Sequence, residues 1–387
     1  MSQMPELPPL GLYIHLPWCV RKCPYCDFNS HELRTGVPEK AYVEALLADL
    51  DFELSNPAIK DRALQTLFIG GGTPSLFSEQ SIENLLTGVK SRIACTEEME
   101  VTLEANPGTF ECGRYLGYRE AGVNRLSIGV QSFHSESLAQ IGRIHGQDEV
   151  LQAIASVHES GFESFNLDLM CGLPGQTLEM ARADVRMAIE AKPDHISYYQ
   201  LTLEPNTPFY RQPPEAMPAD DPAAAIQLEG RRLLERAGYR QYEVSAYARQ
   251  NKSCRHNLNY WRFGDYIGIG AGAHGKLTTV SPWQVERRWR TRGPAEYLRL
   301  AGSAAALSGQ NRLSAKDLFI EFMMNALRLK DGFGAALFVQ RTGLDESYLW
   351  DRLRQPLEQG LLVREGGVIG TSESGWLFLD DVIAGLI

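Results

Sequence analysis

The sequence predicts an α/β fold: a partial (β/α)6 TIM-type barrel followed by a small winged-helix-like domain. Three observations carry this prediction. Short β-rich runs alternate with longer amphipathic stretches through the first half of the 387-residue chain. A polar residue or a glycine run stands at the end of each β-rich run. In parallel α/β folds, the catalytic and binding residues lie at these C-terminal strand ends. From about residue 311 the order changes to helices followed by a turn-rich, β-prone stretch.

Six runs predict the strands of the barrel, and amphipathic segments lie between them. A helix over Lys40–Leu54 is predicted by its apolar spacing, with Pro38 and Glu39 as its start. Six units are fewer than the eight of a closed barrel, so we expect an open, partial barrel over residues 1–203. The predicted strands are Leu12–His15, Thr66–Ile69, Glu100–Leu103, Arg125–Val130, Ser164–Leu169 and His195–Leu201.

Residues 204–310 are predicted to form an extension of the barrel. A proline-rich connection leads to a helix at about 222–237 and to an extended run, Gln241–Ala248. The stretch His256–Trp261 reads His-Asn-Leu-Asn-Tyr-Trp, and glycine and alanine are dense over Gly264–Gly275. Such small residues allow a flat ligand or another backbone to approach closely.

Residues 311–387 are predicted to form the winged-helix-like domain. Helices are expected over Asp317–Lys330, Ala335–Thr342 and Ser347–Gln359. A β-prone stretch at Gly360–Ser374 and a short helix at Trp376–Ile383 follow. The third helix lacks the basic stripe of a DNA-binding surface, so we expect a lid or a partner-docking domain.

Composition and charge argue against several classes of protein. The formal net charge of −10 argues against a nucleic-acid surface. No basic segment followed by an apolar one begins the chain, and no run has the length of a membrane helix, so a cytoplasmic location is expected. Of seven cysteines, four are scattered singly, so no disulfide framework is expected. These four are Cys95, Cys112, Cys171 and Cys254.

The other three cysteines form the most specific motif of the chain. Cys19, Cys23 and Cys26 have Cys-x3-Cys-x2-Cys spacing, directly after the first predicted strand. Thiolates bind soft metals, and so tight a loop can direct three of them at one centre. On spacing alone, a zinc knuckle with His15 or His31 as fourth ligand stays open beside an iron–sulfur cluster. A four-iron cluster with three thiolates would leave one iron open to another ligand.

Chemical groups also stand at the ends of the other predicted strands. The second strand leads into Gly-Gly-Gly-Thr-Pro at residues 70–74, which lacks the Gly-Lys-Ser/Thr of a phosphate-binding loop. The third, fourth and fifth strands end at Glu104, Gln131 and Asp168. The sixth ends near Gln200 and Glu204. Because parallel strands end at the same rim, these groups predict one site.

The motifs resemble those of a known superfamily. Cys-x3-Cys-x2-Cys with an aromatic residue before the last cysteine is typical of radical S-adenosylmethionine (SAM) proteins. Tyr-Ile-His-x-Pro-Trp-Cys, Gly-Gly-Gly-Thr-Pro and His-Asn-Leu-Asn-Tyr-Trp resemble the HemW family of haem chaperones, relatives of oxygen-independent coproporphyrinogen III dehydrogenase. The resemblance covers nearly the whole chain. It implies a [4Fe–4S] cluster on Cys19, Cys23 and Cys26, SAM on the open iron, and haem.

The resemblance also implies which residues contact SAM. Asp168 interrupts an apolar strand, and a buried carboxylate needs a partner such as the SAM ribose. Alone, Glu104 could be an ordinary loop acid and Tyr25 could be loop packing. The residues implied as cofactor contacts are Tyr13, Tyr25, Asp27, Gly72, Thr73, Glu104, Gln131, Arg143 and Asp168.

For haem, His256 is the leading candidate for the axial ligand. Haem iron is commonly held by histidine, and Tyr260 and Trp261 lie beside it in the sequence, with His274 as a second imidazole. The alternative is that Tyr260 and Trp261 are core packing and that His256 only hydrogen-bonds the backbone.

Three functions follow from these observations. The first is a haem chaperone that transfers haem to an acceptor protein, with membrane-associated proteins among the candidate acceptors. The second is coproporphyrinogen III dehydrogenase, and the third is a winged-helix regulator that senses iron. Phe28 stands where the dehydrogenase has a further cysteine, and only about a dozen residues precede the first predicted strand. We therefore favour the chaperone. The acceptor, SAM cleavage, covalent attachment of haem and the oligomeric state are left open.

Overall fold

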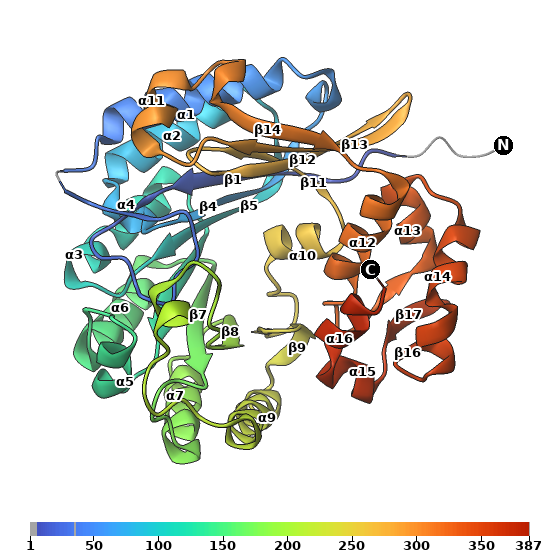
Figure 1. Ribbon diagram of the computed structural model, residues 1–387. Coiled ribbons are helices and arrows are strands. Elements are labelled where there is room, and N and C mark those ends of the chain that lie inside the picture. Colours follow the sequence, from blue (N-terminus) through green and yellow to red (C-terminus); the bar gives the residue numbers. More distant parts are fainter. Residues whose placement is uncertain (1–5, 35, 387) are drawn as a thin grey trace.

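The computed structural model describes residues 6–34 and 36–386. Within them a twelve-stranded mixed sheet is flanked by helices, and a smaller helical unit lies beside it (Figure 1). Six neighbouring strands are parallel and form the partial barrel, as predicted. They are β1 (Leu10–Leu16), β4 (Leu64–Gly71), β5 (Cys95–Ala105), β6 (Arg125–Gln131), β7 (Ser164–Cys171) and β8 (His195–Gln200).

Helices connect these strands and cover one face of the sheet (Figure 1). The predicted first helix is confirmed, beginning directly after Pro38. The longer connecting helices are α1 (Glu39–Leu54), α2 (Glu79–Lys90), α4 (Tyr115–Ala121), α6 (Gln147–Ser160), α7 (Leu178–Glu190) and α9 (Asp220–Arg236). Short helical turns are η1 (Pro57–Ile59), η2 (Pro74–Leu76), α3 (Thr109–Cys112), α5 (Ser135–Gln140) and α8 (Pro208–Arg211).

The segment from 204 to 310 adds strands to both edges of this sheet. The run Gln241–Ala248 is interrupted by a turn, so it forms two antiparallel strands, β9 (Arg240–Glu243) and β10 (Ala246–Ala248), beside β8. At the other edge β11 (Asp265–Ile269) pairs parallel with β1. The antiparallel strands β12 (His274–Val280), β13 (Trp283–Arg290) and β14 (Leu307–Arg312) follow, with α10 (Arg255–Trp261), α11 (Pro294–Leu300) and η3 (Ala304–Ala306) between strands.

Strand pairing explains one glycine of the Gly264–Gly275 segment. A Cβ on Gly268 would lie 1.8 Å from the backbone oxygen of His274. The close approach at this position is therefore to another backbone, one of the two reasons considered for these small residues.

The C-terminal unit has the expected order of three helices and a β-hairpin. It comprises α12 (Ala315–Ala326), β15 (Phe333–Gly334), α13 (Ala335–Thr342), α14 (Glu346–Glu358), β16 (Leu362–Glu365), β17 (Val368–Thr371), α15 (Glu373–Leu377) and α16 (Leu379–Ala384). The single last helix predicted at Trp376–Ile383 is instead two, because the backbone of Phe378 leaves the helical conformation. Phe319, Phe322 and Phe338 contribute to a second hydrophobic core, which also includes Phe263 and Val285 of the preceding segment.

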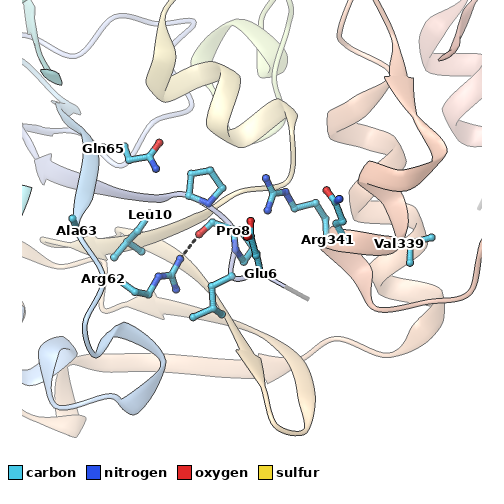
Figure 2. A pocket seen from close by; sticks show the side chains of 11 residues that line it. Glu6, Pro8, Leu10, Arg62, Ala63, Gln65, Val339 and Arg341 are labelled. Atoms are coloured by element: carbon cyan, nitrogen blue, oxygen red, sulfur yellow. Dashed lines mark hydrogen bonds between the residues drawn. The ribbon is translucent and has the colours of Figure 1, made fainter. Parts of the chain in front are cut away.

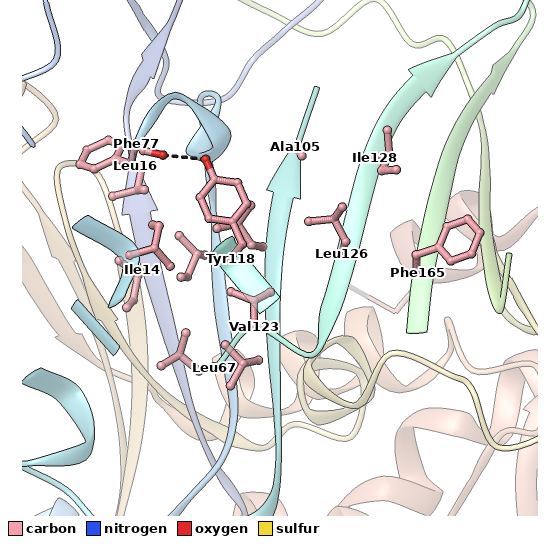
Figure 3. Close-up of a cluster of buried hydrophobic side chains, with 14 of the residues drawn as sticks. Ile14, Leu16, Leu67, Phe77, Ala105, Tyr118, Val123, Leu126, Ile128 and Phe165 are labelled. Atoms are coloured by element: carbon pink, nitrogen blue, oxygen red, sulfur yellow. Dashed lines mark hydrogen bonds between the residues drawn. The ribbon is translucent and has the colours of Figure 1, made fainter. Parts of the chain in front are cut away.

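The alternation of side chains along each strand divides the barrel into an outer apolar core and a polar interior. On β1, Leu12, Ile14 and Leu16 belong to the large core between sheet and helices, which Figure 3 shows in part. Tyr13 and His15 alternate with them and face the interior. The rim at the C-terminal strand ends is therefore lined by polar groups. Among the described residues, no helix is both long enough and apolar enough to cross a lipid bilayer.

Candidate cofactor site at the rim of the barrel

The cysteine loop leaves β1 at the rim and is tied down on both sides. Its two short strands, β2 (Trp18–Cys19) and β3 (His31–Glu32), pair with each other. The Lys22 ammonium donates hydrogen bonds to the backbone oxygens of Phe28 (3.0 Å) and Ser30 (3.3 Å). The Asn29 amide donates to the backbone oxygens of Ala271 and Arg292, at 2.9 Å each. The loop is thus held by the segments that directly follow β11 and β13, in the distant C-terminal half.

The glycine run packs directly on the cysteine loop. Gly72 N–H donates to Leu16 O (2.8 Å) and Thr73 N–H donates to Trp18 O (2.7 Å). A Cβ on Gly72 would lie 2.5 Å from Trp18 O, and Gly71 has a positive φ of 118° against the His15 ring. Gly71 and Gly72 are therefore required by close contact with the protein itself.

A cavity of about 150 Å³ opens between this loop and the strand ends. It brings together most of the residues expected at one site, although they come from positions more than a hundred residues apart. The predicted residues that line it are Cys19, Cys23, Tyr25, Cys26, Gly72, Thr73, Glu104, Gln131, Arg143 and Asp168.

Several lining residues were missed by sequence reasoning, among them Asn106, Ser127, Gly129 and Tyr199. Asn106 lies in the same Leu-Glu-Ala-Asn-Pro-Gly stretch as Glu104 and could have been found there. At the end of β8 the cavity is lined by Tyr199 and not by Gln200, which contacts Gly172. Adjacent residues of a strand point to opposite faces, so a one-residue error exchanges the two.

Two carboxyl groups lie deep in the cavity. Burial, and secondarily the nearby Asp168, raises the pKa of Glu104 to about 8, although Gly71 N–H donates to its Oε2 at 3.1 Å. Burial also raises the pKa of Asp168, against the opposing hydrogen bond that Asn166 donates at 2.7 Å. Neutral carboxyl groups are costly to ionise here without a cationic partner.

Arg143 supplies the positive charge of the same cavity. Its Nη1 donates to Asn106 Oδ1 at 2.8 Å, whereas its buried Nε has no hydrogen-bond partner in the described part of the chain. Gln131 is held beside it in a left-handed conformation (φ 68°), with Tyr199 Oη donating to its Oε1 at 2.7 Å. An unsatisfied buried donor in a polar cavity fits a ligand that carries an anionic group.

Two residues implied as cofactor contacts are not among those lining this cavity. Tyr13 is directed into the barrel, where its hydroxyl is 2.9 Å from His15 Nδ1 and its ring stacks on Phe68. Asp27 is exposed on the cysteine loop. Their predicted contacts with the cofactor stay untested.

The three thiols differ in exposure, since Cys19 is buried while Cys23 and Cys26 are half-buried. No three His, Cys, Asp or Glu side chains within residues 6–34 and 36–386 converge closely enough to ligate one metal ion. A zinc knuckle would also need an imidazole from His15 or His31. The nitrogens of His15 lie 2.9 Å from Tyr13 Oη and 2.8 Å from Asn29 O, and His31 Nε2 lies 3.3 Å from Asn29 Oδ1. Three separate thiols around an open cavity fit a multi-iron cluster, whose ligands bind different iron atoms.

His256 lies on α10. It contacts Thr66 near the N-terminal end of β4, whereas the rim lies at the C-terminal ends of the strands. Its Nδ1 is 2.8 Å from Thr66 Oγ1 and its Nε2 is 2.9 Å from Tyr260 Oη, so both ring nitrogens are engaged. The side chain is buried and stacks on Phe68. Burial lowers the pKa of His256 to about 3. Axial ligation of haem iron would require a hydrogen bond to break and the ring to leave this packing.

His274, the second imidazole, differs in its surroundings. It is exposed at the start of β12, and its ring stacks on Trp289 with a centroid distance of 6.2 Å. Of the two histidines considered for haem, His274 is therefore the accessible one.

Comparisons with known proteins agree with the fold and the site. The Radical SAM superfamily model matches residues 13–188, and the HemN C-terminal domain model matches residues 313–378. The solved structure of coproporphyrinogen III oxidase (HemN) from Escherichia coli has a TM-score of 0.82 at 21% identity, over 100% of this chain and 91% of that one. At this identity the likeness shows the fold alone.

Curated relatives are closer in sequence. The heme chaperone HemW of Escherichia coli is 48% identical over 380 residues, covering 98% of both chains. The heme chaperone HemW of Haemophilus influenzae is 47% identical over 382 residues, again covering 98% of both. The similarity extends through the barrel, the added edge strands and the C-terminal unit, and the chain belongs to the HemW family of the radical SAM superfamily.

Proposed function

We propose that this protein is a haem chaperone, which binds haem and transfers it to an acceptor protein. Its strongest support is 48% identity over 98% of the chain to a relative named heme chaperone HemW.

We further propose that Cys19, Cys23 and Cys26 hold a [4Fe–4S] cluster. The thiols belong to one loop beside the cavity, and the loop is fixed by Lys22 and Asn29. When bound, such a cluster supplies one-electron redox chemistry. The chain's own part is to hold the loop against the glycine run, so that the three thiols keep a fixed separation while the cavity side stays open.

SAM is the ligand that the cavity would take. Arg143 has a free donor for a carboxylate, and Glu104 and Asp168 are acids that a cationic ligand would keep ionised. The two neighbouring hydroxyl groups of a ribose can donate strong, charge-assisted hydrogen bonds to a carboxylate, which would hold the ribose in place. This set of one cation and two acids matches a ligand that carries both charges.

The alternative, coproporphyrinogen III dehydrogenase, is less well supported. The similar fold of HemN would allow it, but fold alone does not assign an activity. Phe28, in place of the additional cysteine, is 61% exposed on the cysteine loop, and its ring offers no thiol for redox or ligand chemistry.

One experiment tests the two functions together. The protein is reconstituted anaerobically with iron, sulfide and SAM, and then assayed in parallel for haem binding and for conversion of coproporphyrinogen III. We expect a Soret band on titration with haem and no protoporphyrinogen. Robust decarboxylation would reverse this ranking, and absence of haem binding would refute the chaperone proposal.

A further inference from the structure

A chain of hydrogen-bonded side chains leads from the rim cavity into the interior of the barrel. It begins at Asp168 and Asn166 on β7 and continues through His195 on β8 to Tyr242 on β9. Asn166 and His195 are each only 1% exposed. Buried polar groups of this kind are costly unless each finds a partner, so their arrangement is a specific feature of the fold. The roles described so far use Asp168 alone.

The amide of Asn166 is oriented by the backbone of β8. Ser197 N–H, which can only donate, lies 3.0 Å from Asn166 Oδ1. The amide NH2 group therefore faces the other way and donates to Asp168 Oδ1 at 2.7 Å and to Ser127 Oγ at 2.8 Å. In the reverse orientation the amide oxygen would face Asp168 Oδ1, and so short a contact would require a protonated acid. Asn166 thus favours the ionised form of Asp168.

His195 is held in one tautomer. Burial, followed by the charge of Arg125, lowers the pKa of His195 well below its ordinary value, so the ring is neutral. Its Nδ1 lies 2.7 Å from the amide oxygen of Asn166 and must therefore carry the single ring proton. Nε2 is then an acceptor, and Tyr242 Oη donates to it at 2.9 Å. Cys254 N–H donates to the same Oη at 3.3 Å, which leaves the hydroxyl proton for His195.

Every donor in this chain is therefore directed toward the rim. Tyr242 donates to His195, which donates to Asn166. Asn166 in turn donates to the carboxylate of Asp168. Hydrogen bonds in series polarise one another, so the amide becomes a stronger donor than it would be alone. Burial raises the pKa of Asp168, and the hydrogen bond from Asn166 opposes this rise.

A polar group at the opposite end of the strands is satisfied by its near neighbours instead. Arg62 lines a cavity of about 710 Å³ between the N-terminal segment and α13 (Figure 2). It pairs with Asp265 at 2.9 Å and donates to Pro8 O at 2.6 Å. These contacts join the segments at the starts of β1, β4 and β11 to one another, whereas the chain from Tyr242 runs toward the strand ends at the rim.

One oxygen of Asp168 is left for a ligand. Oδ1 accepts the short hydrogen bond from Asn166, whereas Oδ2 has only a long contact of 3.5 Å with Ser127 Oγ. Asp168 and Ser127 both line the rim cavity. A buried carboxylate oxygen without a good donor is costly, and a ligand that brings hydroxyl groups would satisfy it.

We propose that Asn166 and His195 are positioning residues of the cofactor cavity, which hold Asp168 as an ionised acceptor for the hydroxyl groups of a ribose. The inference rests on the proposed SAM site. Neither residue is among those lining the cavity, so both act through Asp168. A merely structural role would require no particular tautomer, whereas this role requires the ring proton of His195 on Nδ1.

The first measurement reads the tautomer in the full-length, cofactor-free protein. Nitrogen NMR of isotope-labelled histidines separates rings protonated at Nδ1 from rings protonated at Nε2. His195→Phe identifies the His195 signals by their loss, and Tyr242→Phe identifies Nε2 by a shift, because its donor is removed. We expect protonation at Nδ1 alone at neutral pH. A ring protonated at Nε2, or at both nitrogens, would overturn the proposal.

The second measurement titrates the reconstituted protein with SAM and with a SAM analogue that lacks both ribose hydroxyl groups. The EPR spectrum of the reduced cluster reports binding. His195→Phe removes the donor to Asn166, whereas His195→Asn keeps an N–H donor near the position of Nδ1. Tyr242→Phe removes the donor to Nε2, and its matched control is Tyr247→Phe, because Tyr247 is a buried tyrosine of the neighbouring strand β10 that lies outside the chain.

We expect wild type to bind SAM about tenfold more tightly than the analogue, and His195→Phe to lose most of this preference by a loss of about tenfold in SAM affinity. His195→Asn should recover most of the affinity, Tyr242→Phe should lose about threefold, and Tyr247→Phe should match wild type. Affinity for the analogue should not change in any variant, because it brings no donor to Asp168.

Two results would overturn the positioning role while leaving the SAM site and the chaperone function intact. One is an unchanged SAM affinity in His195→Phe, and the other is an equal loss of affinity for SAM and for the analogue, which would indicate a loosened barrel. If His195→Phe does not fold, Tyr242→Phe against Tyr247→Phe decides by the same two criteria. Failure of wild type to bind SAM would refute the SAM site and this inference together.

Discussion

Replacing Glu104 by glutamine should stabilise the cofactor-free protein, and increasingly so as the pH rises. Glu104 lies in the rim cavity beside Asp168, and burial followed by this neighbouring acid raises its pKa to about 8. An ordinary glutamate has a pKa of 4.5. Between these values the folded protein retains a proton that the unfolded chain has already released. Stability therefore falls as the pH rises from 4.5 to 8.

The size of this effect follows from the shift. The pKa of Glu104 rises from 4.5 to about 8, and each pKa unit corresponds to about 1.4 kcal/mol. Above pH 8, ionisation of Glu104 should therefore lower the free energy of unfolding by about 5 kcal/mol. Because the carboxyl borders an open cavity, water screens part of the unfavourable charge interaction. We therefore expect roughly half of this destabilisation to be measured. Glutamine keeps an oxygen for Gly71 N–H, so the variant loses the ionisation and not the acceptor.

The assay is urea unfolding of the cofactor-free protein at intervals from pH 5 to 9. The difference in unfolding free energy between Glu104→Gln and wild type should be small at pH 5 and grow to about 2–3 kcal/mol at pH 9. Glu97→Gln serves as the control, because Glu97 is exposed on the same strand. A difference for Glu104→Gln that does not change with pH would show that its carboxyl is ionised in the folded state, and the reasoning would fail.

Further predictions concern the cofactors. Cys23→Ala should abolish the brown chromophore and the bound iron of anaerobically prepared protein, whereas Cys95→Ala should retain both; zinc in place of iron in wild type would contradict the cluster assignment. Asp168→Asn should weaken SAM binding about 10- to 100-fold, because a charged acceptor is lost; the SAM-dependent change in the EPR spectrum of the reduced cluster measures it, and an unchanged titration would remove Asp168 from the site. On haem titration, His274→Ala should shift the Soret band, whereas His256→Ala should lower the melting temperature by loss of buried hydrogen bonds. If neither variant alters the band, histidine ligation by these two residues is wrong.

The barrel could be predicted because its signals are local. Each of the six parallel strands is a short β-rich run, and the groups predicted at the ends of the first five line the cavity, whereas Gln200 of the sixth does not. The motif residues of the cysteine loop and of β5 to β7 therefore line the same cavity, as their positions at strand ends require.

The rest could not be predicted because it depends on pairing between distant segments. Nothing near Asp265 indicates that β11 will lie beside β1. His256 has the residue type of a haem ligand, but its partner Thr66 is 190 positions away, and only the fold brings them together. Residue type alone does not distinguish a ligand from a buried hydrogen-bonding group.

The attachment of Asn29 to the backbone of Ala271, across 242 positions, has a consequence for biosynthesis. At about 5–20 residues per second, a ribosome needs roughly 10–50 seconds to make the intervening chain. During that time Cys19, Cys23 and Cys26 have emerged on a loop that lacks its second anchor. Iron delivered to the growing polypeptide would meet these thiols before β11 and β13 fix them, whereas iron delivered after release would meet the completed rim. Pulse-labelled chains halted before and after residue 271 would separate these two routes.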